Sequence, residues 1–498
     1  MDIWGIISKR SILIPSAEIY GQYGGFYDYG PVGCAIKRRI EAAWRDFFIR
    51  REGFLEVDTS TILPEIVLQA SGHVGHFADP LVECTKCKKR FRADYVIRDA
   101  IGKNMDGRPL EEMNRVIKEE GIKCPECGGT LGSASDFNLM FKTTIGAVEG
   151  NTGYMRPETA QGIFLAFPSL FRSFGQKLPL GIAQIGKSYR NEISPRQGLL
   201  RLREFTQMEI EYFFDPEDPT HARFGEVWDE KIRILTREAQ LEGGDEKELT
   251  AAEWVKKGVL PNEIMAYFLV RETQFYTMLG IPYEMFRFRH MLPEETPHYS
   301  GGNFDLEVKT SYGWIETIGN AYRRDYDLSS HAKMSKEDLS VLVDEDGKRR
   351  RFIPHVVEPS FGVDRLFWCL LEASFRKKGE GKEWEWFAFS PLVAPFDAAV
   401  FPLMKKDGLA EKAREVAREL RNSSLSINYD ETGSIGKRYA RADEIGIPYC
   451  ITVDYETLEK NTVTLRFRDD AEQVRLPIEG LSENLRKFAS QGITRKLK

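Results

Sequence analysis

Apolar residues recur along much of this chain every three or four positions, which is the spacing of an amphipathic helix. Residues 34–53 follow this spacing and predict a helix that Gly53 ends. Residues 361–375 predict another helix. The stretch 221–241 is also interpreted as helical, so the segment 217–295 is expected to be a mainly helical insertion.

Other segments predict strands. Residues 54–64 are strand-like and are closed by Pro64. Residues 180–214 are interpreted as two strands joined by a polar loop. Two strand-like runs also flank Asp346-Gly347, a dipeptide typical of hairpin turns.

The order of predicted elements changes near residue 393. A strand at 397–403 precedes a helix at 409–420, and two strands follow at 448–454 and 462–469. Strand, helix and strand in succession indicate a separate α/β domain in this part of the chain.

Composition fits a folded protein of several domains. The chain has 498 residues, 42% hydrophobic and 29% charged, and that length suggests about three domains. The net charge of −6 excludes a nucleic-acid-binding surface that is basic throughout, but it allows a local basic patch. No apolar run approaches the ~20 residues of a membrane helix, and the first residues lack the pattern of a secretion signal. We therefore expect a cytoplasmic protein with no membrane contact.

Four of the seven cysteines form two C-x2-C pairs, Cys84/Cys87 and Cys124/Cys127. Two such pairs allow four thiolates to converge on one tetrahedral ion, which predicts a closed, structural zinc site. The alternative is a pair of reduced turns without metal. The other cysteines are scattered, which suits a reducing compartment rather than a disulfide framework.

The stretch 186–214 combines the side chains that a nucleotide and an amino acid need. If its two halves are strands, Arg190 and Glu192 share one face of the first. Arginines match phosphate oxygens, a phenylalanine can stack on a base, and a carboxylate can hold an ammonium. The alternative is an ordinary salt-bridged sheet face. One face of the second strand would carry Arg201, Arg203, Phe205, Gln207 and Glu209.

A second segment has similar chemistry. Glu358 and Ser360 alternate onto one face of a strand end, and the helix that follows carries Arg365 in its first turn. An arginine there opposes the helix dipole, so it would aim a cation and backbone donors together at an anion. The alternative is a surface arginine paired with Asp364 or Glu372.

Together these residues resemble the three motifs of class II aminoacyl-tRNA synthetases. In this chain the motifs correspond to the first helix with Gly53-Phe54 and Pro64, to Arg190-Asn191-Glu192 with Arg203-Glu204-Phe205, and to Gly362-Val363-Asp364-Arg365. Further segments resemble the homodimeric type of glycyl-tRNA synthetase: Gly24-Gly25-Phe26, Asp28-Tyr29-Gly30-Pro31, Arg92-Ala93-Asp94, Arg156 to Gly162, and Glu358-Pro359-Ser360.

The resemblance implies an α+β fold with an antiparallel-sheet catalytic core, zinc-knuckle and helical insertions, and a C-terminal α/β anticodon-binding domain. It implies a ligase of protein synthesis that joins glycine to tRNA-Gly through a glycyl-adenylate, with Mg²⁺ accompanying ATP, a structural Zn²⁺ and a homodimer. The expected domains are the catalytic core at 1–83 and 131–392, the four-cysteine insertion at 84–130 and the anticodon-binding domain at 393–498.

The resemblance also assigns roles to residues. Arg190 and Arg365 would be catalytic, and Glu316 would bind ATP through magnesium. The ATP site would comprise Arg190, Asn191, Glu192, Leu200, Arg201, Leu202, Phe205, Glu316, Thr317, Gly362 and Arg365. The glycine site would comprise Arg92, Glu158, Phe205, Glu209, Arg323, Glu358 and Ser360, with Arg323 meeting the glycine carboxylate. In the C-terminal domain, Arg466, Arg468, Arg475, Asn428 and Tyr429 would contact RNA phosphates and bases.

Some segments depart from the family pattern, among them Asn320-Ala321-Tyr322-Arg323, His298-Tyr299-Ser300 and Phe304-Asp305. The stretch Lys333–Lys336 resembles a class I synthetase signature but lacks the structural context of that signature. Three alternatives stay open: a catalytically inactive relative that binds nucleic acid, a class II synthetase for another amino acid such as proline or threonine, and a zinc-binding structural protein without ATP chemistry.

Overall fold

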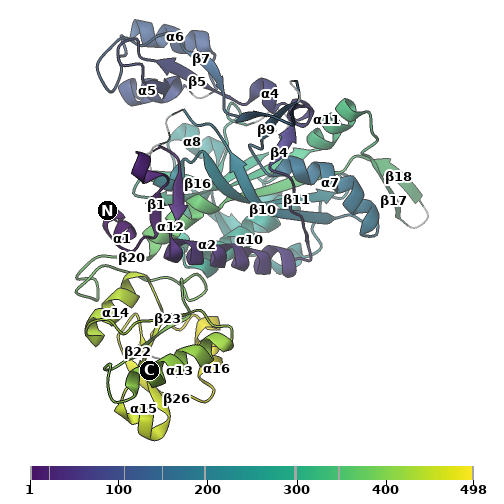
Figure 1. Ribbon diagram of the computed structural model, residues 1–498. Coiled ribbons are helices and arrows are strands. Elements are labelled where there is room, and N and C mark those ends of the chain that lie inside the picture. The colour runs from purple at the N-terminus through teal and green to yellow at the C-terminus, as the bar shows by residue number, and fades with distance from the viewer. Residues whose placement is uncertain are drawn as a thin grey trace.

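The chain forms a central body with a smaller lobe above it and another below it (Figure 1). Asp346 and Gly347 of the expected hairpin turn, and His298 and Tyr299 among the departures, lie outside the described residues. The computed structural model describes residues 3–21, 23–105, 107–147, 150–193, 195, 198–296, 300–345 and 348–495.

A nine-stranded sheet forms the centre of the body. Its strands are β3 (Leu55–Glu56), β10 (Leu180–Tyr189), β11 (Glu204–Phe214), β12 (Lys231–Leu235), β13 (Lys247–Thr250), β14 (Phe286–His290), β15 (Asn303–Thr310), β16 (Gly313–Arg324) and β19 (His355–Gly362). They lie in the order β13-β12-β14-β15-β16-β19-β11-β10-β3. Neighbours are antiparallel, except for β12 beside β14 and β10 beside β3. This is the mostly antiparallel core that the sequence predicts.

Side chains alternate across β11 as expected and give the sheet two different faces. Met208, Ile210 and Tyr212 are buried in the main apolar core. Helices α2 (Pro31–Trp44), α10 (Glu263–Leu279) and α12 (Val363–Ser374) contribute much of this core. Phe205 and Glu209 face the other side, which leaves that face available for a site.

The first predicted helix ends where the sequence indicates. Helix α2 continues as a π-helical turn, Arg45–Arg50. Gly53 then adopts a φ of +74°, a left-handed conformation that glycine takes at little cost. The apolar stripe of α2 and of the π-helical turn, from Ile36 to Phe48, belongs to the main apolar core.

The segment 217–295 differs from its prediction as a mainly helical insertion. Besides α8 (Arg237–Glu242), α9 (Ala251–Lys256) and α10, it supplies strands β12, β13 and β14 to the main sheet. The helix predicted over 221–241 is wrong where β12 lies. Ile232 and Ile234, two positions apart, are both fully buried, while Lys231 is exposed and Arg233 is only partly buried. This period of two is that of a strand, and pairing with β13 and β14 fixes it.

The upper lobe has a small apolar core of its own. It contains the sheet β6-β5-β7, formed by β5 (Ala78–Glu83), β6 (Arg90–Arg92) and β7 (Ser135–Asn138), with α5 (Ala93–Ile101) and α6 (Leu110–Glu119). Its core runs from Val82 to Ala134. The lobe therefore extends beyond the expected insertion 84–130, because the strands at its base belong to the same sheet.

The lower lobe is the predicted α/β domain. Its sheet has the order β23-β22-β24-β25-β26. The elements are β22 (Ala398–Pro402), α13 (Leu409–Asn422), β23 (Ile427–Tyr429), α14 (Ile435–Glu444), β24 (Tyr449–Val453), α15 (Tyr455–Lys460), β25 (Thr462–Phe467), β26 (Gln473–Pro477) and α16 (Leu481–Ser490). Arg39 of the body bonds Asp397 at 2.8 Å where the two parts meet.

Three arginines expected to contact RNA serve the lower lobe itself. Arg466 and Arg468 are 5% and 1% exposed, and Arg466 makes a bidentate pair with Asp443 at 3.0 Å on both arms. Arg475 pairs with Asp454 at 2.7 Å. For Arg466 and Arg468 the expectation is wrong, because a buried guanidinium bound to its own lobe is not available to a phosphate.

Smaller elements complete the body and its connections to the two lobes. They are α1 (Trp4–Lys9), β1 (Leu13–Pro15), β2 (Tyr27–Tyr29), β4 (Ile62–Pro64), α3 (Glu65–Ala70), α4 (His73–His76), β8 (Lys142–Thr144), β9 (Thr152–Met155), α7 (Ala160–Ser173), α11 (Tyr326–Ser335), β17 (Val341–Glu345), β18 (Lys348–Phe352), β20 (Phe375–Arg376) and β21 (Trp386–Phe387). Lys333–Lys336, the stretch like a class I signature, is the end of α11 and its cap.

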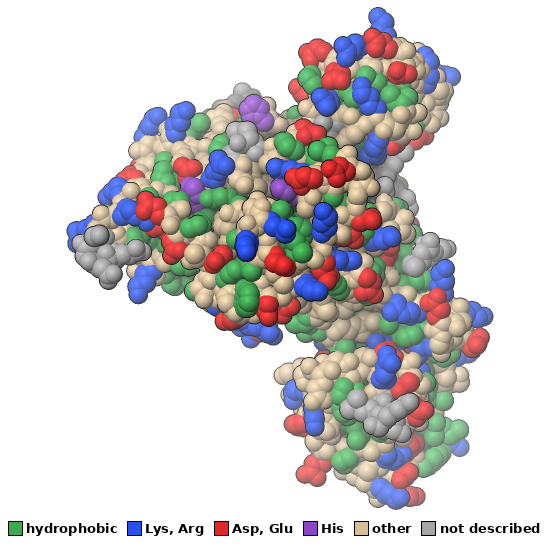
Figure 2. Space-filling model, turned by 180° about the vertical axis from the view of Figure 1, so that it is seen from behind, with side chains coloured by type: hydrophobic (Ala, Val, Ile, Leu, Met, Phe, Trp, Pro, Cys, Tyr) green, Lys and Arg blue, Asp and Glu red, His purple; other side chains and the backbone are tan. Residues whose placement is uncertain are grey.

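Basic and acidic side chains are interspersed over the body and both lobes on the face that Figure 2 shows. This agrees with the small net charge of −6 and with the exclusion of a basic coat. Among the described residues, none of the helices has the length and apolar character needed to span a membrane.

Candidate active site

One cavity of about 230 Å³ opens on the site face of the main sheet. It lies where β11, β16 and β19 run side by side and where α12 begins. Its lining comprises Glu158, Arg190, Glu192, Leu199, Leu200, Arg201, Leu202, Phe205, Thr206, Gln207, Glu209, Glu316, Thr317, Gly319, Glu358, Ser360, Gly362, Asp364 and Arg365. Of the residues predicted for the ATP and glycine sites, only Asn191, Arg92 and Arg323 do not line it.

Arg190 is positioned by the end of β10 rather than within a strand. Strand β10 ends at Tyr189, so Arg190 and Glu192 lie in the following turn, and their predicted placement on a strand face is wrong. The Arg190 Nε donates to the Pro157 carbonyl oxygen at 3.1 Å. Its guanidinium lies 5.3 Å from the centre of the Phe205 ring. Arginine and ring thus form a wall against which a flat base and a phosphate both fit.

Arg365 reaches into the cavity from the first turn of α12. Its Nε donates to the Leu200 carbonyl oxygen at 3.1 Å, and its guanidinium pairs with Glu316 at 3.2 Å. The alternative partners, Asp364 and Glu372, are bound elsewhere. Asp364 accepts from the Thr206 backbone N–H, and Glu372 accepts from Ser311 and Trp368. Arg365 is therefore a cation at the cavity wall.

Carboxylates dominate the opposite end of the cavity. Glu209 accepts a hydrogen bond from the Ser360 hydroxyl at 2.6 Å and another from the Thr159 hydroxyl. Glu358, on β19, accepts from Arg323 at 2.6 Å. Glu158 accepts from the Gln161 amide at 2.8 Å. These fixed partners aim carboxylate oxygens at one small volume.

Burial and mutual repulsion shift the pKa values of these acids. Burial, against the opposing effect of Arg323, raises the pKa of Glu358 to about 8. Burial and the neighbouring Glu158 also raise the pKa of Glu209. Burial disfavours ionisation of Glu158 too, yet His73 and Arg323 outweigh it and lower its pKa. The site thus holds both ionised and protonated carboxyls near neutral pH.

Arg323 lies outside the cavity lining and links two acids next to it. It makes a bidentate pair with Asp327 at 2.7 and 2.9 Å and a third bond to Glu358. The predicted contact with a glycine carboxylate is not supported, since three of its donors already serve these acids. Asp327 lies four residues further along the chain, in the first turn of α11, whereas Arg323 is on strand β16. The helical i, i+4 rule does not apply across this strand-to-helix junction, so the sequence offers no simple signal for the pairing.

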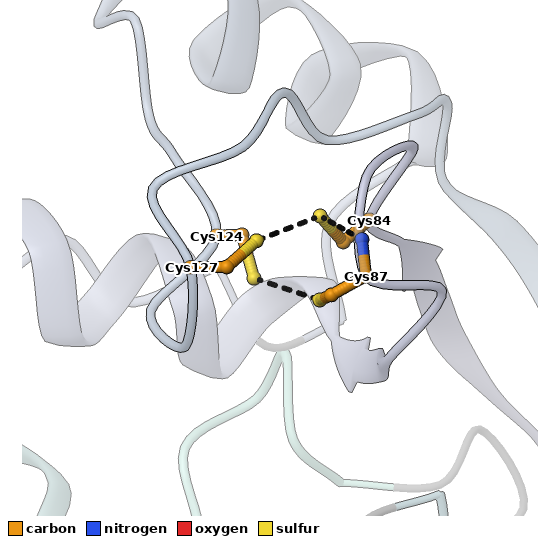
Figure 3. Close-up of side chains that lie close together, drawn as sticks. All are labelled: Cys84, Cys87, Cys124 and Cys127. Atoms are coloured by element: carbon orange, nitrogen blue, oxygen red, sulfur yellow. Dashed lines mark hydrogen bonds between the residues drawn. The ribbon is translucent and has the colours of Figure 1, made fainter.

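The four-cysteine centre lies in the upper lobe. Figure 3 shows the two C-x2-C loops facing each other, with Cys84 and Cys87 on one side and Cys124 and Cys127 on the other. The four Sγ atoms all lie within 4.8 Å of one another, and the distances Cys84–Cys127 and Cys87–Cys124 are 3.6 and 3.7 Å. A tetrahedral ion with Zn–S bonds of 2.3 Å requires sulfurs about 3.8 Å apart. The donor set therefore fits zinc.

Comparisons with known proteins agree with this geometry. A family model described as the tRNA synthetase class II core domain (G, H, P, S and T) matches residues 141–374, and one described as the anticodon binding domain matches residues 397–488. The chain is 43% identical to the glycine–tRNA ligase of Methanothermobacter thermautotrophicus over 97% of its own length and 98% of the relative's. The chain belongs to the glycine–tRNA ligases.

Other members of the glycine–tRNA ligase family are similarly close. The ligase of Pyrococcus horikoshii is 43% identical over 97% of both chains, and that of Methanocaldococcus jannaschii is 41% identical over 97% of this chain. The alignments span 557 and 567 positions, more than the 498 residues of this chain. These relatives thus carry segments that this chain lacks. The class II family prediction is confirmed, and synthetases for proline or threonine are set aside.

In this ligase the upper lobe touches the active site through Tyr95. The Tyr95 hydroxyl oxygen accepts a hydrogen bond of 2.5 Å from Arg201, which lines the cavity. The Tyr95 ring also lies 4.3 Å from the Arg92 guanidinium. Arg92 in turn pairs with Asp79 at 2.8 Å and with Asp94 at 2.6 Å. Arg92, predicted to bind glycine, therefore lies outside the cavity and supports Tyr95.

The Tyr95→Phe variant is expected to raise the KM for ATP about tenfold. It removes one hydrogen bond to a charged group, worth roughly 1.5–3 kcal/mol, but keeps the ring against Arg92 and Arg201. The KM for glycine should stay unchanged, because Tyr95 lies at the Arg201 end of the cavity. Steady-state pyrophosphate exchange at varied ATP measures this. Tyr455→Phe is the matched control, since it removes a hydroxyl bound to Asp407 in the lower lobe.

Proposed function

We propose that this protein activates glycine with ATP and transfers the glycyl group to tRNA-Gly. The supporting observation is one cavity with two chemically opposite ends: Arg190, Phe205 and Arg365 at one, and Glu209 and Glu358 at the other. The end with Arg190, Phe205 and Arg365 suits a nucleoside triphosphate. The second suits an ammonium group beside a space too small for a side chain.

The first step is an in-line displacement at phosphorus. The glycine carboxylate attacks the α-phosphate of ATP, the bond to the β-phosphate breaks, and glycyl-adenylate and pyrophosphate form. Arg190 would hold the α-phosphate and Arg365 the γ-phosphate, so both stabilise negative charge as it moves toward the leaving group. Phe205 would stack on adenine. Mg²⁺ arrives with ATP as part of the substrate, and Glu316 at the cavity wall is its proposed contact.

Recognition of glycine would rest on the acidic end. Glu209 and Ser360 are already bonded to each other at 2.6 Å, which fixes the carboxylate that takes the ammonium. Glu158 and Glu358 would complete that pocket. An added methyl would crowd the side chains of this pocket, so larger amino acids would be excluded by steric clash rather than by weaker attraction.

In the second step the terminal ribose hydroxyl of the tRNA attacks the acyl carbon, and AMP leaves. Positioning supplies most of the acceleration, since no protein nucleophile is needed. The lower lobe is the proposed site for the anticodon. Asn428 and Tyr429 line a cavity of about 330 Å³ together with Lys9 and Arg10 of the body, which makes them better candidates for RNA contact than the buried Arg466.

A structural metal and a second copy of the chain are also part of the proposal. Cys84, Cys87, Cys124 and Cys127 would hold a structural Zn²⁺ whose four thiolates leave no open position. None of the seven cysteines, all of them among the described residues, forms a disulfide, which fits the reducing cytoplasm. A homodimer is proposed on the resemblance of α2 and the strand after it to the dimer-forming motif of the class.

The test is ATP–pyrophosphate exchange with each of the twenty amino acids, without tRNA. We expect exchange with glycine alone. Exchange with a different amino acid would keep the adenylating chemistry but reject the pocket assignment. No exchange by folded, zinc-loaded protein would favour an inactive relative that only binds nucleic acid.

A further inference from the structure

Behind the acids that line the cavity lies another carboxylate, Glu211, which the reaction as described does not use. It is on β11 and is 0% exposed. Among the described residues, neither of its carboxylate oxygens has a hydrogen-bond donor from another side chain or the backbone, and the group it can share a hydrogen bond with is the Glu358 carboxyl. Pairing of Glu209 with Ser360 and of Tyr212 with Val357 fixes the register of β11 against β19 and places Glu211 opposite Glu358.

Glu211 belongs to a tight group of buried acids. One carboxylate oxygen from each of Glu209, Glu211 and Glu358 lies within 4.8 Å of those of the other two. Arg323 is the cation that faces them from β16, and it is already bound to Asp327 and Glu358. Carboxylates this close, with one shared cation and no water access for Glu211, do not all ionise together.

Among the described residues, Arg323 is the cation that acts on Glu211. Arg156, in the turn before α7, is a second buried cation nearby, but it acts on Glu209 and its own hydrogen bonds go to Lys187, Thr59 and Gln184. Helix α11 contributes Asp327 and His331, and the pKa of His331 is lowered by burial. The turn before α7 contributes Glu158, which lies 3.6 Å from His73. On β10 the residue paired with Glu211 is Ile182, which has no charge.

We propose that Glu211 and Glu358 share a proton in the protein without glycine, and that this proton leaves when the ammonium group of glycine binds. The O–H bond of the carboxyl breaks, the proton passes to solvent through the open cavity, and the carboxylate left behind faces the incoming ammonium. No electrons are transferred. This inference rests on the proposed function and assigns Glu211 as a positioning residue that sets the charge of Glu358.

The directions of the pKa values support this assignment. Burial and the neighbouring Glu358 raise the pKa of Glu211 well above its usual range, and the pKa of Glu358 rises to about 8. Below about pH 8 the pair therefore carries a proton that the ammonium must displace. Affinity for the ammonium should rise with pH, by up to tenfold per unit, and level off near pH 8.

The experiment is calorimetric titration of the full chain with glycyl-sulfamoyl-adenosine, a non-hydrolysable analogue of the adenylate, at pH 7. Titrations in phosphate and in Tris, which differ in ionisation heat, give the number of protons released. Sulfamoyl-adenosine, which lacks the ammonium, is the control ligand. We expect about one proton released with the glycyl compound and none with the control ligand.

One variant and its control show whether the released proton comes from the pair that includes Glu211. Glu211→Gln should reduce the release by at least half while the glycyl compound still binds. Glu272→Gln is the matched control, because Glu272 is another fully buried carboxyl with a pKa raised by burial, but it bonds Asn320 and does not line the cavity. It should release as many protons as the unmodified protein.

The outcomes separate the two claims. Tight binding of the glycyl compound with no proton release overturns the inference and leaves the proposed function standing. Undiminished release by Glu211→Gln overturns the assignment to Glu211. Absence of binding by folded protein overturns the proposed function itself. If Glu211→Gln does not fold, the unmodified protein still decides, because an affinity independent of pH between 6 and 8 contradicts the shared proton.

Discussion

Replacing Arg190 by alanine is expected to lower glycine-dependent ATP–pyrophosphate exchange by about 10³-fold or more. Arginines that stabilise a transferring phosphoryl group are typically worth about 10³–10⁵ in rate. Arg190 lines the cavity, and its Nε bond to the Pro157 carbonyl oxygen fixes where the guanidinium points. Arg190→Lys should recover little of the loss, because an ammonium cannot make the two parallel bonds of a guanidinium.

The measurement is kcat for exchange at saturating glycine and ATP, with circular dichroism to check the fold. Arg376→Ala is a suitable control, since Arg376 bonds only nearby backbone carbonyls and does not line the cavity. It should exchange at close to the normal rate. A folded Arg190→Ala protein with near-normal exchange would remove Arg190 from the mechanism.

Loss of the four-cysteine centre is expected to unfold the upper lobe and weaken ATP binding. A structural zinc site contributes roughly 10–16 kcal/mol of apparent binding free energy, far more than the small core around Val82 supplies. Cys124→Ser should therefore contain much less than one zinc per chain. Because α5 carries Tyr95, disorder of the lobe should also release Arg201 and raise the KM for ATP by at least tenfold.

Zinc content by mass spectrometry, limited proteolysis and ATP kinetics together check this. Cys34→Ser is the control, since Cys34 is exposed and far in sequence from the quartet. It should keep full zinc and ATP affinity. If the unmodified protein, prepared with zinc, binds none, or if Cys124→Ser keeps one ion per chain, the structural zinc site is refuted.

Much of the site was predictable because its parts are local patterns. Alternation along β11 separates Phe205 and Glu209 from the core residue Met208, and neighbouring residues alone determine that. The position of Arg365 is likewise local, because it lies in the first turn of α12, directly after the strand that carries Glu358 and Ser360. The two C-x2-C pairs each close a loop within four residues, so their convergence needs only that the two loops meet.

Other predictions failed where a distant partner decides. Arg323 looked available for a carboxylate, but Glu358, on the neighbouring strand β19, joins Asp327 in binding it. Arg466 was expected to contact RNA, yet it is buried and its guanidinium is bound by Asp443 on α14. Strand β12 was taken for helix because only its pairing with β13 and β14 selects the period of two.

The sequence by itself determined the class of the fold, the two-ended chemistry of the cavity and the cysteine quartet, because each depends on residue type and on spacing along a few turns or strands. Tertiary structure alone decided which arginines stay available and which are bound by acids of their own protein. It also decided that Tyr95 of the upper lobe reaches Arg201 and that Glu211 lies buried beside Glu358 with no donor group of the described residues bonded to it. Those facts depend on Coulomb and hydrogen-bond partners that are brought together only when the sheet, helices and lobes pack.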